Sequence, residues 1–216
     1  MAHLTLRLLG APEVYLDGRP VTAFATDKAR ALLYYLASER DRPHRREALA
    51  GLLWPDQPEE RARQSLRQTL TYLRQALGES EASAAPLLAV TREPVPLDAA
   101  AGLELDIAAF VARIQECRRH HHRRALACPP CLERLRQAAE LYRGDLLSGF
   151  LLGDSVAFEE WATLKREWRH REAVAALALL ADFHERRGEY DEARGYAQRL
   201  VALEPWREEA HRQLMG

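Results

Sequence analysis

Apolar and polar residues alternate at the start of the chain, which predicts short β-strands. Leu4 and Leu6 are separated by polar residues, and this spacing is typical of a strand with one buried face. The dipeptide Asp17-Gly18 lies between two apolar runs, where it is typical of a hairpin turn. Residues 3–24 are therefore expected to be extended.

Three helices are expected next, because apolar residues now recur every three or four positions. The first has Thr26 or Asp27 as its N-cap and stops before Pro43. The second covers residues 45–54. The third covers residues 58–78, with a proline in its first turn and a glycine just after its last turn, where each is favoured.

The third predicted helix has one apolar face, which includes Leu66, Leu70 and Leu73, and a long polar face opposite. No acidic residue occurs between Arg61 and Gly78. In a DNA major groove, Arg can pair with guanine, Gln with adenine, and the Thr methyl can meet thymine. The alternative is an ordinary solvated face, because charged outer faces are routine. The candidate DNA contacts on this helix are Arg61, Arg63, Gln64, Arg67, Gln68, Thr71 and Arg74.

Basic side chains are also expected on both sides of this helix. Residues 87–90 and 95–97 predict a hairpin with Arg92 near its tip, from where Arg92 would enter the minor groove. Arg45 and Arg46, at the start of the second helix, would contact phosphates. Strands, three helices and a closing hairpin together form the order of a winged helix.

The C-terminal half has helical spacing throughout, from about residue 103 onward. Predicted helices begin at Asp106, at Cys128 and after Ser155, and the last of these continues towards Arg187. This half is therefore expected to be a helical domain without strands.

The end of the chain follows a known repeat. From Leu177 to Pro205, the spacing of small and apolar residues fits the tetratricopeptide repeat (TPR), in which paired helices stack on their neighbours. A further unit begins at Trp206 and is cut off at Gly216. The protein is therefore expected to continue, because an apolar face would otherwise lack its stacking neighbour. That face comprises Leu200, Leu203 and Leu214.

The predicted fold class is mainly α with a small N-terminal β component. A winged helix-turn-helix domain would occupy residues 1–100, and a TPR-like helical domain, truncated at its C-terminal end, residues 101–216. Lys plus Arg (31) nearly cancel Asp plus Glu (32), so only the local placement of charge can support nucleic-acid binding. The start lacks the pattern of a signal peptide, and no apolar run approaches the roughly 20 residues that span a bilayer. We expect a cytoplasmic protein with no membrane contact.

A cluster of cysteines and histidines predicts a metal site. Its members are Cys117, His120, Cys128 and Cys131. A Cys-x2-His pair followed by a Cys-x2-Cys pair is ligand-type spacing for a structural zinc ion, and His121 or His122 could replace the histidine. Two alternatives stay open: three reduced, partly buried thiols, or a redox-active pair at a helix N-terminus. Zinc is the one cofactor that the sequence suggests.

No catalytic motif accompanies these patterns. The chain contains no phosphate loop, glycine-rich dinucleotide motif or zinc-protease helix, so it is not expected to be an enzyme. A thiol oxidoreductase would require a reactive cysteine of low pKa. His44 and His170 are expected to be ordinary surface residues.

Both halves contain motifs that resemble known families. Residues 4–98 resemble the OmpR-type winged helix, and residues 104–216 resemble the bacterial transcriptional activator domain. The first resemblance is carried by the leading strands, Lys28–Leu33, Leu49–Trp54, Pro55-Asp56, Leu73-Arg74 and Leu77-Gly78. The second is carried by Leu141–Leu147, Gly149-Phe150 and Phe158–Trp161.

This order of domains is similar to that of the antibiotic regulatory proteins. The resemblance implies a sequence-specific DNA-binding transcriptional activator, with the third helix in the major groove. It also implies double-stranded DNA and RNA polymerase as partners, and a homodimer on repeated sites near promoters. The alternative is a TPR-type scaffold for protein–protein interaction, in which the winged helix is a docking module.

Overall fold

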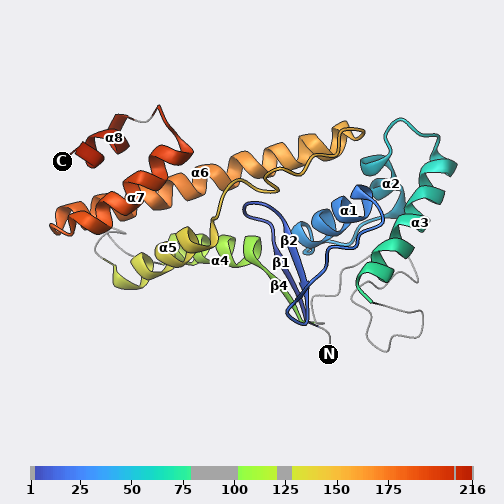
Figure 1. Ribbon diagram of the computed structural model, residues 1–216, viewed down its shortest axis with the longest axis horizontal. Coiled ribbons are helices and arrows are strands. Elements are labelled where there is room, and N and C mark those ends of the chain that lie inside the picture. The colour runs from blue at the N-terminus through green and yellow to red at the C-terminus, as the bar shows by residue number, and fades with distance from the viewer. Residues whose placement is uncertain (1–2, 79–101, 121–127, 207, 216) are drawn as a thin grey trace. The chain divides into compact units, whose positions relative to one another are not determined.

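The computed structural model describes residues 3–78, 102–120, 128–206 and 208–215 (Figure 1). The chain forms two compact units, and each combines two separate stretches of sequence. The first unit comprises Met1–Leu105 with Leu147–Leu164, and the second comprises Asp106–Leu146 with Lys165–Gly216. The fold is mostly helical with one small sheet, which confirms the predicted fold class.

The sheet of the first unit has the strand order β3-β2-β1-β4. Its strands are β1 (Leu4–Arg7), β2 (Glu13–Leu16), β3 (Arg19–Pro20) and β4 (Leu103–Leu105). The predicted turn at Asp17-Gly18 is confirmed, and both residues have positive φ (49° and 75°). β4 corrects the expectation of an entirely helical C-terminal half, because it pairs in parallel with β1. A strand of three residues is too short to show alternation, and its partner lies about a hundred positions away.

Three helices from the N-terminal stretch of the chain pack in the first unit, as predicted. They are α1 (Asp27–Ser38), α2 (Arg46–Leu53) and α3 (Glu59–Ala76). Thr26 is the N-cap of α1, and its hydroxyl accepts a hydrogen bond from the backbone N–H of Ala29 at 3.2 Å. Buried leucines from all three helices form the core. The predicted hairpin that contains Arg92 lies outside the described residues.

Residues 147–164, which are predicted to belong to the helical domain, pack in the first unit. The backbone N–H of Leu147 donates to the carbonyl of Leu8 at 2.9 Å. The indole N–H of Trp161 donates to Glu39 Oε1 at 2.9 Å. Phe150 and Phe158 are almost fully buried, so this segment completes the core of the first unit.

The second unit is helical. It contains α4 (Asp106–Arg119), α5 (Pro129–Leu141), α6 (Val156–Arg186, from residue 165 onward), α7 (Tyr190–Leu203) and α8 (Glu208–Met215). Figure 1 shows α4 and α5 side by side. His184 on α6 stacks on Tyr196 of α7, with ring centroids 5.6 Å apart. The guanidinium of Arg199 on α7 donates to the carbonyls of Ala139 at 2.7 Å and Tyr142 at 3.0 Å, which joins α7 to the end of α5.

Two sequence expectations need correction. Leu200 is buried, with 1% of its surface exposed, so it does not belong to an unstacked apolar face. Leu203 is half-buried, and the side chain of Leu214 lies outside the described part. His44 is not a surface residue, because it is buried and its Nε2 lies 3.0 Å from the carbonyl of Glu39.

Candidate nucleic-acid interface and metal cluster

The helix α3 presents two chemically different faces. Leu66, Leu70 and Leu73 are buried in the first unit, each with 1% or less of its surface exposed. The opposite face is exposed and polar, and comprises Arg61, Gln64, Arg67, Gln68, Thr71 and Gln75. One face therefore holds the helix in the core while the other is open to a ligand.

The basic and amide side chains of α3 differ in the ion pairs and hydrogen bonds that they form within the protein. Arg63 forms ion pairs with Glu59 at 2.7 Å and with Glu47 of α2 at 3.0 Å, so its charge is already partly compensated. Within the described part of the chain, the side chains of Arg61, Gln64 and Arg67 form no hydrogen bond or ion pair. These three side chains are the ones most available to an external ligand.

Other predicted contacts are held more tightly. The Gln68 amide donates to the hydroxyl of Tyr72 at 2.5 Å, which orients it along the helix surface. The Thr71 hydroxyl donates to the backbone carbonyl of Arg67 at 3.1 Å, as expected for a helical threonine. Arg74 is half-buried beside the core.

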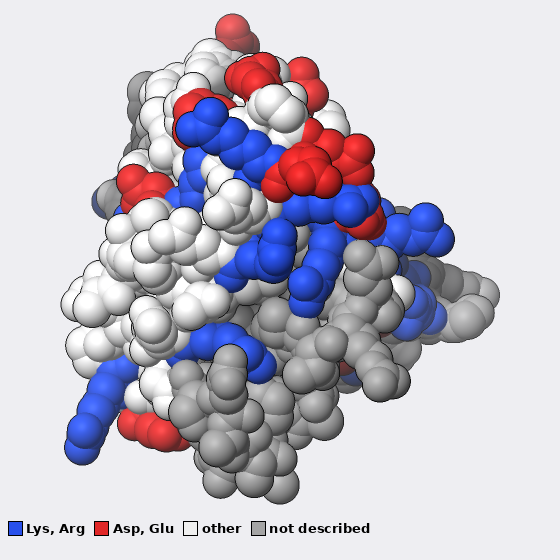
Figure 2. Space-filling model, turned by 90° about the vertical axis from the view of Figure 1, so that its right-hand side faces the viewer, with Lys and Arg blue, Asp and Glu red and all other residues white. Residues whose placement is uncertain are grey.

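The N-terminus of α2 adds basic side chains to the same unit. Arg45 is the N-cap residue of α2 and is exposed, while Arg46 is half-buried. Figure 2 shows the side of the molecule that lies at the right of Figure 1. On it, Lys and Arg side chains gather next to a rim of Asp and Glu side chains. Charge is thus sorted locally, although the whole chain has a net charge of only −1.

A further cation, Lys28, lies near α3. Lys28 lies in a hollow of about 590 Å³ beside α3, which is also lined by Gln68 and Tyr72. Its ammonium lies 2.9 Å from Asp154 and 5.0 Å from the centre of the Trp54 ring, and it also donates to the carbonyl of Leu53. Because these contacts already use its charge, Lys28 stabilises the fold and is not a candidate contact.

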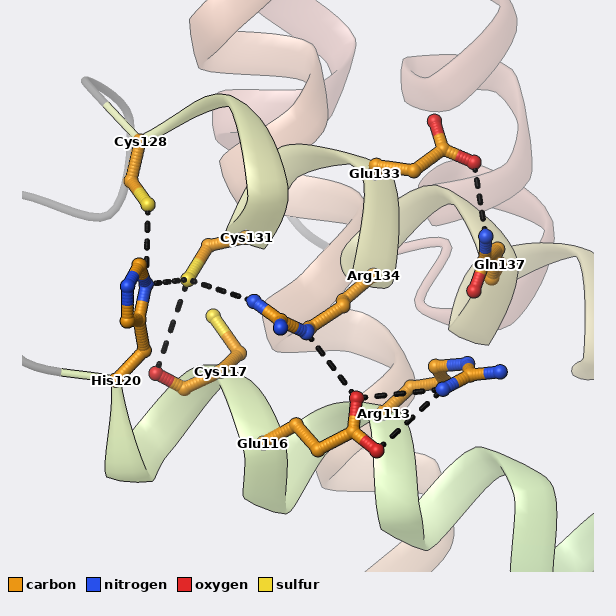
Figure 3. A network of polar contacts seen from close by, with 9 residues as sticks. All are labelled: Arg113, Glu116, Cys117, His120, Cys128, Cys131, Glu133, Arg134 and Gln137. Atoms are coloured by element: carbon orange, nitrogen blue, oxygen red, sulfur yellow. Dashed lines mark hydrogen bonds and ion pairs between the residues drawn. The ribbon is translucent and has the colours of Figure 1, made fainter.

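Three of the four predicted metal ligands, His120, Cys128 and Cys131, meet where α4 ends and α5 begins (Figure 3). His120 Nδ1 lies 3.2 Å from the sulfur of Cys128 and 3.2 Å from that of Cys131. The Cys131 sulfur lies 3.9 Å from the backbone carbonyl of Cys117. All three thiols are buried and none forms a disulfide. His120, Cys128 and Cys131 are close enough together to hold a metal ion.

The surroundings of the cluster bear on the redox alternative. Burial, followed by the neighbouring Cys117 thiol, raises the pKa of the Cys131 thiol above its ordinary value. A thiol oxidoreductase needs the opposite shift in at least one cysteine. Arg134 lies beside the cluster, with Nη1 4.0 Å from the Cys131 sulfur, and its Nε donates to Glu116 at 3.1 Å.

Comparison with known proteins connects this architecture to a family. Residues 105–216 match the model of the bacterial transcriptional activator domain. The chain belongs to the bacterial transcriptional activator domain family. Residues 21–93 match a second model, described as transcriptional regulatory protein, C terminal. Both models describe transcriptional regulators and neither describes an enzyme, which confirms the predicted class and the order of the two domains.

The chain is also similar to the regulator EmbR. The transcriptional regulatory protein EmbR of Mycobacterium tuberculosis is 38% identical over 76 residues, which is 35% of this chain and 19% of EmbR, and the Mycobacterium bovis protein gives the same values. The solved structure of M. tuberculosis EmbR in complex with a low-affinity phosphopeptide aligns with a TM-score of 0.71 and 26% identity. That alignment covers 99% of this chain and 54% of the EmbR chain. The chain thus spans about half the length of the solved relative.

No helix in the described part of this family member is long and apolar enough to cross a membrane.

Proposed function

We propose that this chain binds duplex DNA sequence-specifically, with α3 in the major groove, and thereby regulates transcription as an activator. The observation that carries the proposal is the exposed face of α3, where Arg61, Gln64 and Arg67 have no partner among the described residues. From Arg61 to Gly78 no acidic residue opposes a phosphate backbone. Arginine and glutamine side chains on such a face match the hydrogen-bonding groups of guanine and adenine.

The remaining candidates take different proposed roles. Arg45, exposed at the start of α2, would contact phosphate, and half-buried Arg46 and Arg74 would support the backbone contact from the sides. Arg63 would mainly hold α2 and α3 together through its pairs with glutamates on both helices. The minor-groove contact by Arg92 remains a proposal from the sequence alone.

The proposal extends to the partners. DNA binding is assigned to the winged helix, proposed within residues 1–100, and partner contact to the helical domain, proposed within residues 101–216. RNA polymerase is the proposed protein partner, because the family is one of transcriptional activators. Two copies would bind repeated sites near a promoter. Since the proposed target is the bacterial chromosome, we place the protein in the cytoplasm.

The test is selection of binding sites from random duplexes with the full chain, followed by fluorescence anisotropy on the selected duplex. Replacing both Arg67 and Gln68 by Ala should cost about 1–3 kcal/mol for each lost base contact and relax the preferred sequence. Arg45→Ala should weaken binding to every duplex. It should also lower the steepness of the plot of log binding constant against log salt concentration by about 0.9. Arg171→Ala removes the same charge from an exposed position in the second unit and serves as the matched control.

Wild-type affinity and preference in the Arg67/Gln68 double variant would show that α3 does not read bases. A loss equal to that of Arg171→Ala would mean that only overall charge matters. A chain that binds no duplex in a salt-dependent way would instead support the alternative of a scaffold for protein–protein interaction.

We also infer that the cluster binds a zinc ion, in a structural role. Thiolates and imidazole are the ligands that zinc prefers, and harder cations prefer oxygen. Elemental analysis of protein purified without a His tag should find about one zinc per chain. Chelation should lower the stability of the second unit and leave the first unit folded, because all the ligands belong to the second. Protein with far less zinc and freely reactive thiols would contradict this.

A further inference from the structure

The ends of α4 and α5 bring two pairs of ligand-type side chains to one place. Cys117 and His120 are three positions apart at the end of α4, so they lie on the same helix face. Cys128 and Cys131 have the same spacing at the start of α5, where the backbone N–H of Cys131 donates to the carbonyl of Cys128 at 3.0 Å. This turn directs both thiols to the same side.

The distances approach those of a tetrahedral zinc site. With Zn–S near 2.3 Å and Zn–N near 2.0 Å, a nitrogen and a sulfur on the same ion are about 3.5 Å apart. His120 Nδ1 lies 3.2 Å from each of the sulfurs of Cys128 and Cys131. Three ligand atoms are therefore already close to the required arrangement, with the histidine facing the thiols through Nδ1.

A fourth ligand, the thiol of Cys117, is within reach. Cys117 is buried, with 7% of its surface exposed, and its backbone carbonyl lies 3.9 Å from the Cys131 sulfur. Figure 3 shows the Cys117 side chain pointing from α4 towards the Cys131 sulfur. A change of its side-chain rotamer would direct this thiol at an ion held by the other three ligands.

The charges near the cluster match such a site. A zinc ion with three thiolates and one neutral imidazole carries a single negative charge, which a buried site must compensate. Arg134 Nη1 lies 4.0 Å from the Cys131 sulfur, and Glu116 fixes the guanidinium by accepting from Nε at 3.1 Å. The N-terminus of α5, at which Cys128 is the N-cap, adds partial positive charge. Three neutral thiols would need neither the Arg134 guanidinium nor the helix N-terminus for compensation.

We propose that the zinc site is closed, with Cys117 as the fourth ligand beside His120, Cys128 and Cys131, and with Arg134 as the cation that compensates its charge. This inference rests on the proposed zinc binding and specifies its coordination. The ion would fasten the end of α4 to the start of α5. Since no coordination position is left open, the site would be structural and not catalytic.

X-ray absorption spectroscopy of the wild-type, zinc-loaded chain tests the ligand set without any variant. We expect three sulfurs at about 2.3 Å and one nitrogen at about 2.0 Å. Two sulfurs with additional nitrogen or oxygen would overturn the role of Cys117 and leave zinc binding intact. A chain that takes up no zinc would overturn the proposed zinc binding itself, so the two failures are distinguishable.

Arg134 is tested by competition with a chelator. Arg134→Gln should weaken zinc binding about 10- to 100-fold, the range for loss of an outer partner, while the absorption spectrum keeps its three-sulfur form. Arg113→Gln is the matched control, because Arg113 pairs with the same Glu116 at 3.2 Å but has no contact with a sulfur. Unchanged affinity in Arg134→Gln, or an equal loss in Arg113→Gln, would overturn the role of Arg134.

Discussion

Replacing Phe158 by alanine should destabilise the first unit, although the residue lies within the match to the activator domain. Its side chain is fully buried. Its ring lies edge-on to Phe150 with centroids 6.2 Å apart, and 5.2 Å from the ring of Trp161. These two rings in turn meet Tyr34 and Tyr35 of α1 at 5.2 Å and 4.9 Å. Phe158 therefore supports the contacts that hold α1.

The expected cost is about 4 kcal/mol. Truncating a buried phenylalanine to alanine typically costs 3–5 kcal/mol, which already includes the cavity left behind. The lower end of that range does not apply, because aromatic pairs contribute about 0.5–1.5 kcal/mol beyond their buried area. Against a total stability of about 5–15 kcal/mol for a typical protein, such a loss would be large.

Hydrogen exchange followed by mass spectrometry can assign the loss to a unit. In Phe158→Ala, amides of α1 and β1 should lose protection while those of α4 and α5 keep it. The control is Leu164→Ala, in the same helix and unit but 69% exposed, which should change stability by less than about 0.5 kcal/mol. Equal stability of the two variants, or a loss confined to α4 and α5, would refute the assignment of this segment to the first unit.

Three smaller effects can be measured by urea denaturation. Thr26→Ala removes the N-cap of α1 and should cost about 1 kcal/mol, whereas Thr26→Ser should restore most of it. Burial raises the pKa of Tyr142, so its contribution to the free energy of unfolding is complete below pH 10. Above pH 10 this contribution should fall by about 1.4 kcal/mol per pH unit. Tyr142→Phe should remove this part of the pH dependence. Hydrogen bonds from Arg187, and then from His184, lower the pKa of Glu189. The contribution of Glu189 to the free energy of unfolding is therefore present above pH 4.5 and lost as the pH falls. Glu189→Gln should remove this dependence of stability on acid pH.

Local features of the fold could be predicted from the sequence. The cap at Thr26 and the two faces of α3 depend on residues within a few positions of one another, so their spacing is visible in one dimension. The proximity of the two residues within each pair, Cys117 with His120 and Cys128 with Cys131, could also be predicted, because each pair occupies a single helical turn.

Features that depend on distant partners could not be predicted in this way. β4 has only three residues, and its place is fixed by β1. The sequence shows that Phe150 and Phe158 are apolar but not that they pack in the first unit. Likewise, Arg63 is a plausible DNA contact in a helical projection, and only the fold shows that it pairs with Glu47 of another helix.

The interleaved order of the two units has a consequence for synthesis of the protein. Contacts that close the first unit join residues far apart in sequence: Ser155 to Leu52, 103 positions away, and Trp161 to Glu39, 122 positions away. A ribosome must therefore translate all of α4 and α5 before the N-terminal segment can acquire its last core residues. Until then Tyr34 and its neighbours lack their native cover, and such exposed apolar surface promotes aggregation. We expect the nascent chain to depend on chaperones for longer than a winged helix encoded by one continuous segment.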